Sequence, residues 1–139
     1  MTSFLILLFG TLINLTSCGI IYPVDTTPPT VISVFPANGS TDAWIDTNIS
    51  FTFSEAIDPS TITASGSFSL VSSEGPITGS ITYDAISKTA TFTPNHLGFW
   101  TTYTATISAD VKDIAGNAMA NKFTWSFSTS GPPLSPHPL

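Results

Sequence analysis

Apolar and polar residues alternate in short runs between Thr30 and Thr129, and turn residues separate these runs. An alternation with a period of two turns one face of a strand toward a core and leaves Thr and Ser on the other face. No stretch of this region shows the 3.6-residue period of an amphipathic helix convincingly. The runs predict seven strands, at residues 30–36, 48–54, 67–72, 80–84, 89–94, 102–108 and 123–129.

The side chains predicted to face inward are large and mostly aromatic or aliphatic. They are Ile49, Phe51, Phe53, Phe68, Leu70, Ile81, Tyr83, Ala90, Phe92, Tyr103, Ala105, Ile107, Phe123, Trp125 and Phe127. Each large one contributes about 1.5–3 kcal/mol when it is buried. Seven short strands joined by turns favour an all-β, immunoglobulin-like sandwich of two antiparallel sheets. The alternative, a closed barrel, would need about eight or more evenly spaced strands.

Two local features add detail to this sandwich. The residues between 84 and 89 form a hairpin turn, which places Ile81 and Tyr83 opposite Ala90 and Phe92. Asp58 and Pro59 are typical of the cap and first position of one short helical turn.

Composition narrows the classes of function. The chain has 139 residues and one cysteine, so it forms no intramolecular disulfide and its core must supply the stability alone. Only 9% of the residues are charged and the net charge is −6. Lys88, Lys112 and Lys122 are the three basic residues, too few for a nucleic-acid surface or for electrostatic attachment to anionic lipid.

The N-terminal 17 residues are typical of a signal peptide. Residues 4–15 form an apolar run of about the right length, shorter than the roughly 20 residues that a membrane-spanning helix needs. The next motif, Leu-Thr-Ser-Cys at 15–18, resembles the lipobox of bacterial lipoproteins. The resemblance implies cleavage before Cys18 and acylation of Cys18, as with palmitate, so that membrane lipid becomes a partner of the chain.

One feature departs from the lipoprotein pattern. The first residues carry no Lys or Arg, although signal peptides normally begin with positive charge. The alternatives are an ordinary signal peptide with an incidental cysteine, or an uncleaved anchor that reaches Tyr22. Gly19, and not Asp, follows the cysteine, and the resemblance to Gram-negative lipoproteins then implies no retention at the inner membrane. We therefore expect an outer-membrane or cell-surface location. Residues 18–29, with Pro23, Pro28 and Pro29, then form an extended lipidated tether.

Tyr103 belongs to a local motif within the predicted sandwich. It lies near the start of the penultimate strand, after a leucine and a turn, which resembles the tyrosine corner of immunoglobulin-like domains. We expect its hydroxyl to bond back to the chain near Leu97; the alternative is a plain inward aromatic.

Residues 30–130 resemble the bacterial immunoglobulin-like domain of the S-layer-protein type. The motifs that carry this resemblance are Pro-x-Asn-Gly at 36–39, Ile-x-Phe-x-Phe-Ser-Glu at 49–55, Ala-Thr-Phe-Thr-Pro at 90–94 and Val-Lys-Asp-x-Ala-Gly-Asn at 111–117. The family's members are mostly repeated modules of surface and secreted bacterial proteins, and they act as spacers, scaffolds and binding modules. The resemblance implies a non-catalytic structural or adhesive module; this chain holds one copy where the family often has several.

The stretch from Asp110 to Asn117 offers a candidate calcium site. Calcium takes six to eight oxygen ligands, and Asp110, Asp113 and Asn117 supply some of them, but no Glu closes the loop. Asp25 and Asp42 would complete the site if they lie at the same end of the sandwich. The alternative, which we favour, is a plain turn between the last two strands that uses Gly116 and Asn117.

Three aromatic residues fall in predicted loops rather than at inward strand positions. Trp44, Phe99 and Trp100 could stack on sugar rings and bind a glycan, or they could contact a protein of the envelope. A loop aromatic more often forms a lid over the end of a sandwich, and the sequence leaves both interpretations open.

Residues suited to catalysis are scarce. Cys18 is expected to be acylated, and the two histidines lie in a turn, at His96, and in the tail, at His137. The sequence has no Gly-x-Ser-x-Gly motif, no metal-binding histidine pair and no phosphate-binding glycine loop. We therefore expect no enzymatic activity and no required cofactor. The tail, residues 131–139, holds four prolines and should stay extended.

Overall fold

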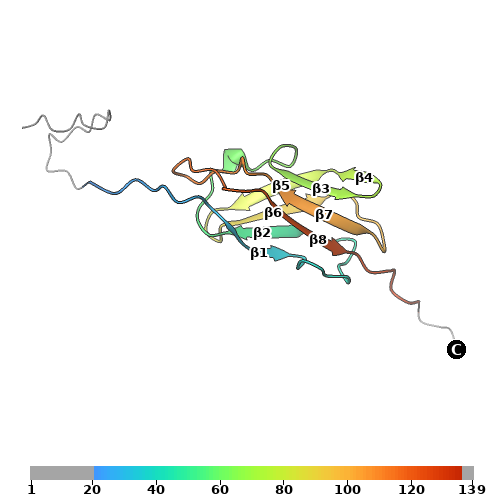
Figure 1. The fold of residues 1–139 in the computed structure, drawn as a ribbon. Helices are drawn as coiled ribbons and strands as arrows, with labels where there is room; N and C mark the ends of the chain where they lie inside the picture. Colours follow the sequence, from blue (N-terminus) through green and yellow to red (C-terminus); the bar gives the residue numbers. More distant parts are fainter. Residues whose placement is uncertain (1–20, 136–139) are drawn as a thin grey trace, which may run out of the picture.

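The computed structural model describes residues 21–135 and shows a sandwich of two four-stranded sheets (Figure 1). The strands are β1 (Val31–Phe35), β2 (Ile49–Phe53), β3 (Phe68–Ser72), β4 (Gly75–Ile77), β5 (Gly79–Asp84), β6 (Thr89–Pro94), β7 (Thr102–Ile107) and β8 (Phe123–Ser128). One short 3-10 helix, η2 (Pro59–Thr61), begins after Asp58, whose side chain accepts a hydrogen bond from the N–H of Ser60. The predicted all-β fold and the predicted helical turn are confirmed.

Every pairing of strands within the two sheets is antiparallel. The first sheet has the order β1-β2-β6-β5 and the second has the order β4-β3-β7-β8. The predicted hairpin register is confirmed, because Ile81 lies opposite Phe92 and Tyr83 lies opposite Ala90. The chain enters at one end of the sandwich and leaves at the other, so the loops fall into two groups at opposite ends (Figure 1).

Aromatic rings from both sheets meet in the core. Phe51 of β2 stacks on Phe68 of β3 with ring centroids 5.1 Å apart, and Phe92 of β6 lies 4.8 Å from the same ring. Trp125 of β8 contacts the edge of Phe51 and donates a hydrogen bond from Nε1 to the carbonyl of Pro36, at 3.1 Å. The predicted inward faces of β2, β3 and β7 are buried, so contacts across the two sheets form one continuous core.

The structure adds one strand to the seven predicted from the sequence. Residues 75–77 form β4, which pairs with β3, where the sequence predicted only a turn. A three-residue strand that contains Pro76 is too short to show an alternating pattern, and proline is tolerated because β4 is an edge strand.

β8 is an edge strand of the second sheet, and the loop that follows β1 covers its outer edge. The N–H of Gly39 donates to the carbonyl of Ser126, and the N–H of Ser128 donates to the carbonyl of Ser40, both at 2.7 Å. These bonds protect an edge that could otherwise pair with another chain. Within residues 21–135 the helical content is one short turn, and no helix there is long and apolar enough to cross a membrane.

Candidate functional site

The residues predicted to bind ligands divide between the two ends of the sandwich. Asp113 and Asn117 lie in the β7–β8 loop, at the end where the N-terminal segment arrives, because the Asn117 side chain contacts the backbone of Asp25. Trp44 lies at the end where the C-terminal segment leaves, since Ser130 donates to the carbonyl of its neighbour Ala43. We call these the carboxylate end and the aromatic end.

At the carboxylate end, Asp113 closes the turn between the last two strands. Its Oδ1 accepts the backbone N–H of Asn117 at 2.7 Å, and its Oδ2 accepts Nδ2 of Asn117 at 2.8 Å. Gly116 takes the positive φ that the turn requires, +95°, which favours glycine. The turn that we favoured from the sequence is thus confirmed, and Asp113 is its buried centre, with 2% of its surface exposed.

Three carboxylates gather beside this turn. Oxygen atoms of Asp25, Glu55 and Asp113 lie within 4.8 Å of one another. Asp110 stands outside this group and accepts a hydrogen bond from Ser108, and Asp42 lies at the opposite end, beside Ala43. Of the residues predicted as ligands, the structure therefore brings Asp25 beside Asp113 and leaves Asp110 and Asp42 outside the group.

Glu55, which follows β2, is not among the ligands predicted from the sequence. The motif at 49–55 contains this residue, but only the fold shows that the end of β2 lies beside the β7–β8 loop, where Ile57 pairs with Asp113 in an isolated bridge. A contact between positions so far apart in the chain leaves no pattern in a single sequence.

Burial, hydrogen bonds and neighbouring charges shift the pKa values of two of these groups. Partial burial raises the pKa of Glu55, and the negative charges of Asp25 and Asp113 raise it further. Burial also opposes ionisation of Asp113, but the hydrogen bonds from Asn117 and from nearby backbone N–H groups outweigh it and lower the pKa of Asp113. The turn thus keeps Asp113 ionised, and the resulting charge makes Glu55 a weaker acid.

These shifts predict the effect of neutralising Glu55. A carboxyl whose pKa is raised by folding destabilises the folded state at pH values above that pKa, and this cost disappears as the pH falls toward the unfolded value, near 4.5. We expect Glu55→Gln to raise the melting temperature modestly at pH 7 and to have no effect near pH 4. The control is Glu74→Gln, which removes an exposed carboxylate in the β3–β4 turn. A Glu55→Gln protein that melts below wild type at pH 7 would contradict the conclusion that folding raises the pKa of Glu55.

The calcium interpretation stays a prediction. The carboxylates of Asp25, Glu55 and Asp113 could supply side-chain oxygens to an ion, but both oxygens of Asp113 already accept hydrogen bonds. The oxygens of Asp25 and Glu55 alone are fewer than the six to eight that calcium takes. Equal melting temperatures of a calcium-free sample with and without millimolar calcium would dispose of it.

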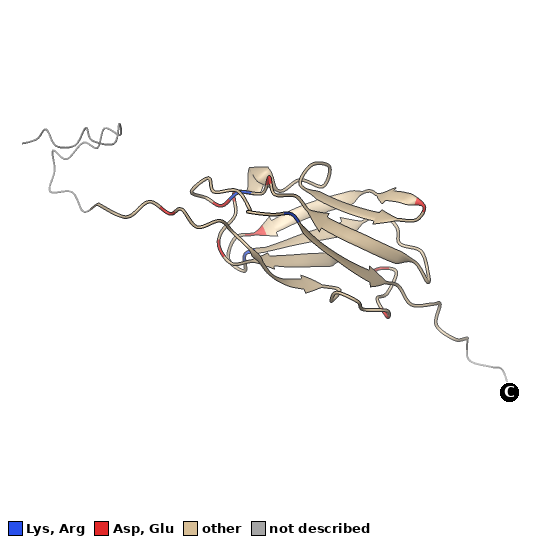
Figure 2. Cartoon of the chain, in the orientation of Figure 1, with Lys and Arg blue, Asp and Glu red and all other residues tan. Residues whose placement is uncertain are grey.

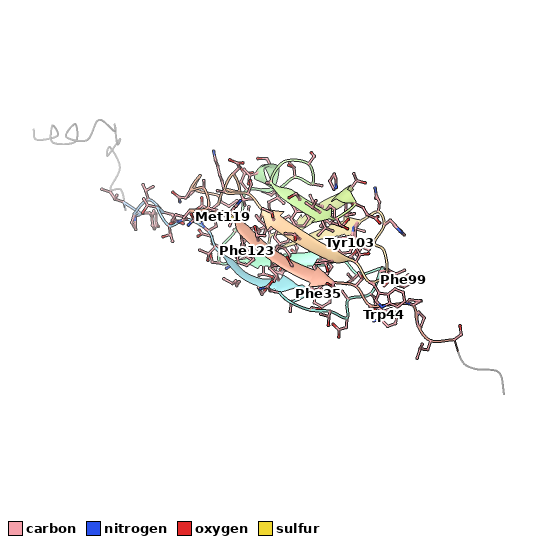
Figure 3. All side chains as sticks on the ribbon, turned by 45° about the vertical axis from the view of Figure 1, so that its right-hand side comes forward. Phe35, Trp44, Phe99, Tyr103, Met119 and Phe123 are labelled. Carbon is pink, nitrogen blue, oxygen red and sulfur yellow. The ribbon has the colours of Figure 1, made fainter. Side chains whose placement is uncertain are left out.

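At the aromatic end, the three predicted loop aromatics are exposed. Trp44, Phe99 and Trp100 keep 57%, 39% and 76% of their surface open to water. The rings of Phe99 and Trp100 are 6.4 Å apart, and Figure 3 shows Trp44 and Phe99 at the end from which the C-terminal segment leaves. Trp44 and Trp100 are therefore not buried in the core, and their rings are accessible to a ligand.

The tyrosine corner positions the loop that carries Phe99 and Trp100. The hydroxyl of Tyr103 accepts the backbone N–H of Gly98 at 2.7 Å, as the motif predicted. Thr129 donates from its own hydroxyl to the carbonyl of Gly98, at 2.6 Å, and Leu97 is buried in the core. Both the N–H and the carbonyl of Gly98 are therefore hydrogen-bonded, and these bonds anchor the loop that carries Phe99 and Trp100.

Some of the predicted features lie outside the described residues. Cys18 and the signal peptide fall before residue 21, and residues 136–139, with His137, fall after the described part. Residues 21–29 are described and carry no regular structure, and most of them are exposed. Lipidation of Cys18 stays a prediction.

Comparison with known proteins agrees with this architecture. Residues 25–129 match the bacterial Ig-like domain family. A search of curated proteins finds no match. The solved structures that are similar include domains 1–6 of the surface layer protein SbsC, at 27% identity and a TM-score of 0.58. That match covers 76% of this chain and 14% of the SbsC chain.

Two other similar structures share the fold alone. CopC from Methylosinus trichosporium OB3b is 14% identical with a TM-score of 0.60, over 74% of this chain and 94% of that protein. Native alpha-2-macroglobulin from Escherichia coli, in a crystal structure spanning domains MG0-NIE-MG1, is 18% identical with a TM-score of 0.57, over 75% of this chain and 32% of that one. The family match spans most of the chain and agrees with the two-sheet topology, so this chain belongs to the bacterial Ig-like domain family.

Proposed function

We propose that the protein is a non-catalytic module of the bacterial cell envelope, held at a membrane by lipid on Cys18. In this role it displays its Ig-like domain as a structural or adhesive element. The observation that carries the proposal is the family match together with the 27% identity to the surface layer protein SbsC. The match covers 14% of the SbsC chain, so this domain corresponds to one small part of SbsC.

The geometry of the domain supports this role. The N-terminal segment, which would lead from the lipid, reaches the sandwich at the carboxylate end, and the exposed aromatic rings lie at the other end (Figures 1 and 3). A tether at one end directs the opposite end away from the membrane surface. The aromatic end is then the part of the domain that meets other molecules of the envelope.

The residues at the two ends support the non-catalytic part of the proposal. Asp113 serves the turn through Asn117, and the exposed histidine of the described part, His96, lies in a loop before Leu97. The LD transpeptidase LdtMt1 is similar to this chain at 20% identity, and a similarity at that level shows a shared fold alone. A domain that supplies packing and loops fits a scaffold better than an enzyme.

A second candidate function is specific binding of a glycan or a protein of the envelope. The exposure of Trp44 and Trp100 favours it, because exposed large aromatics are common at binding surfaces. A pure scaffold should tolerate the loss of both rings, whereas a binding module should lose affinity when the ring that contacts its ligand is removed.

Palmitate labelling in a Gram-negative host tests the anchor. We expect the wild-type chain to incorporate labelled palmitate and to sediment with membranes, and Cys18→Ala to lose the label completely because it lacks the thiol. Trp44→Ala is the matched control, since it leaves the lipobox intact and should label as wild type does. Absence of label in the wild type, or label remaining in Cys18→Ala, would overturn the proposed anchor.

A further inference from the structure

An open groove of about 750 Å³ lies at the aromatic end, on the second sheet. It forms where β3 and β7 separate: the last pair of the two strands is Val71 with Thr104, after which β3 turns into β4 while β7 extends back to Thr102. Ser72 at the end of β3 forms one side together with Ser73 and Glu74 of the β3–β4 turn, and Trp100, Thr102 and Thr104 contribute to the rest. We call this the Trp100 groove.

The ring of Trp100 is held in place although it is exposed. Trp100 has a φ of +47°, a conformation that bulky residues rarely adopt, and its N–H donates to the carbonyl of Ser130 at 3.3 Å. Its ring lies so close to Gly131 that a Cβ at that glycine would be 2.1 Å from Cζ2 of the ring. Strained backbone that holds an exposed ring is found at functional sites, and burial in the core does not account for it here.

The polar groups of the groove are suited to hydroxyl-rich ligands. The hydroxyls of Thr102 and Ser128 lie 2.7 Å apart, and those of Thr104 and Ser126 lie 3.1 Å apart. Because each hydroxyl can both donate and accept, each pair keeps capacity for a ligand. The exposed carboxylate of Glu74 adds a strong acceptor. A pyranose has an apolar face that can stack on an indole and hydroxyls around its edge, so it matches both features.

Charge decides which class of glycan fits. The three lysines lie in the half of the domain near the carboxylate end, as the blue segments of Figure 2 show, and none of them lines the groove. Lys88, for example, donates to the carbonyl of Ser54, after β2. With Glu74 as the charge of the groove and a net charge of −6 on the chain, an anionic polymer would be repelled.

We propose that the Trp100 groove binds a neutral polysaccharide, with one sugar ring stacked on Trp100 and its hydroxyls bonded to Glu74 and to the threonines of β7. The inference rests on the proposed function, because it names the class of partner that the displayed aromatic end meets. Trp44 and Phe99 lie at the same end but do not line the groove, so the binding assignment moves from three aromatics to one.

The test titrates the full chain, purified in a zwitterionic detergent, with four hexasaccharides. Three are neutral, made of β-1,4-linked glucose, N-acetylglucosamine or mannose, and the fourth is the acidic hexagalacturonate. Isothermal titration calorimetry gives the Kd, and tryptophan fluorescence reports the stacked ring. We expect at least one neutral hexasaccharide to bind and hexagalacturonate not to bind. Trp100→Ala should weaken binding by at least about tenfold, as loss of a central tryptophan does at other interfaces.

Two variants make the test specific. Trp44→Ala removes an exposed tryptophan outside the groove and should change the Kd less than about twofold. Glu74→Gln keeps the shape of the turn and should weaken binding by at least about threefold, because it removes a charged acceptor. Failure of all three neutral hexasaccharides to bind at millimolar concentration overturns the proposal, as does equal weakening by Trp44→Ala.

Sedimentation of the wild type and of Trp100→Ala separates a glycan site from a protein contact. A wild-type chain that self-associates through Trp100 would make the groove an interface between copies and overturn the glycan proposal. Palmitate incorporation is independent of all these outcomes, so failure of the glycan proposal is distinguishable from failure of the proposed anchor.

Discussion

Replacement of Phe51 by alanine is expected to lower the free energy of unfolding by about 3–5 kcal/mol. The ring is fully buried, stacks on Phe68 of the opposite sheet, and contacts the edges of Phe53 and Trp125. Its removal takes away apolar contacts from both sheets and leaves a cavity between them. With no disulfide in the chain, the domain has no covalent bond to offset that loss, and urea unfolding followed by tryptophan fluorescence measures the change.

The matched control for Phe51→Ala is the neighbouring residue on the other face of β2. Ser50 is partly exposed and pairs with Thr91 of β6, so Ser50→Ala keeps the strand and leaves the core intact. We expect that substitution to change stability by less than about 0.5 kcal/mol. Equal effects of the two substitutions would mean that the inner face of β2 does not hold the sheets together.

Tyr103→Phe should lower the free energy of unfolding by about 1–3 kcal/mol. The substitution keeps the aromatic ring, which stacks on Phe127 at 5.6 Å, and removes only the hydroxyl that accepts the N–H of Gly98. That N–H then has no acceptor in a partly buried loop. We also expect the amide hydrogen of Gly98 to exchange with solvent faster in the variant, which hydrogen exchange followed by NMR detects.

Tyr22→Phe is the control for the tyrosine corner. Tyr22 is exposed in the N-terminal segment, and removal of its hydroxyl should change neither the stability nor the exchange of Gly98. If Tyr103→Phe unfolds at the same urea concentration as wild type and Gly98 stays protected, the hydroxyl does not hold the loop and the corner is an ordinary core aromatic.

The alternation of the sequence predicts most of the sandwich because β2, β3, β6, β7 and β8 each bury alternate residues. Phe51, Phe68 and Trp125 all fall at inward positions, and the structure brings them into one cluster. The pattern fails for β4, whose three residues cannot alternate, and for the loop at 38–43, which pairs with β8 through its backbone. Backbone pairing depends little on side-chain type, so the sequence carries no clear sign of it.

The candidate sites are harder to predict because they depend on which loops meet. Asp113 and Asn117 are four residues apart and their turn follows from local chemistry, whereas Glu55 reaches the same place only through the fold. The position of the Trp100 ring likewise depends on a distant residue, since the ring lies against Gly131. A loop tryptophan predicts a ring near the end of the sandwich, but whether that ring covers the core or faces solvent is decided by its backbone conformation and by its neighbours.

The central claim is that stacked rings hold the two sheets face to face, and a double-mutant cycle between Phe51 and Phe68 tests it most directly. The cycle compares the urea unfolding of Phe51→Ala, Phe68→Ala, the double variant and wild type, and it isolates the contact between rings on opposite sheets. Our account predicts a coupling energy of about 0.5–1.5 kcal/mol. Additive effects of the two substitutions, with no coupling, would contradict it.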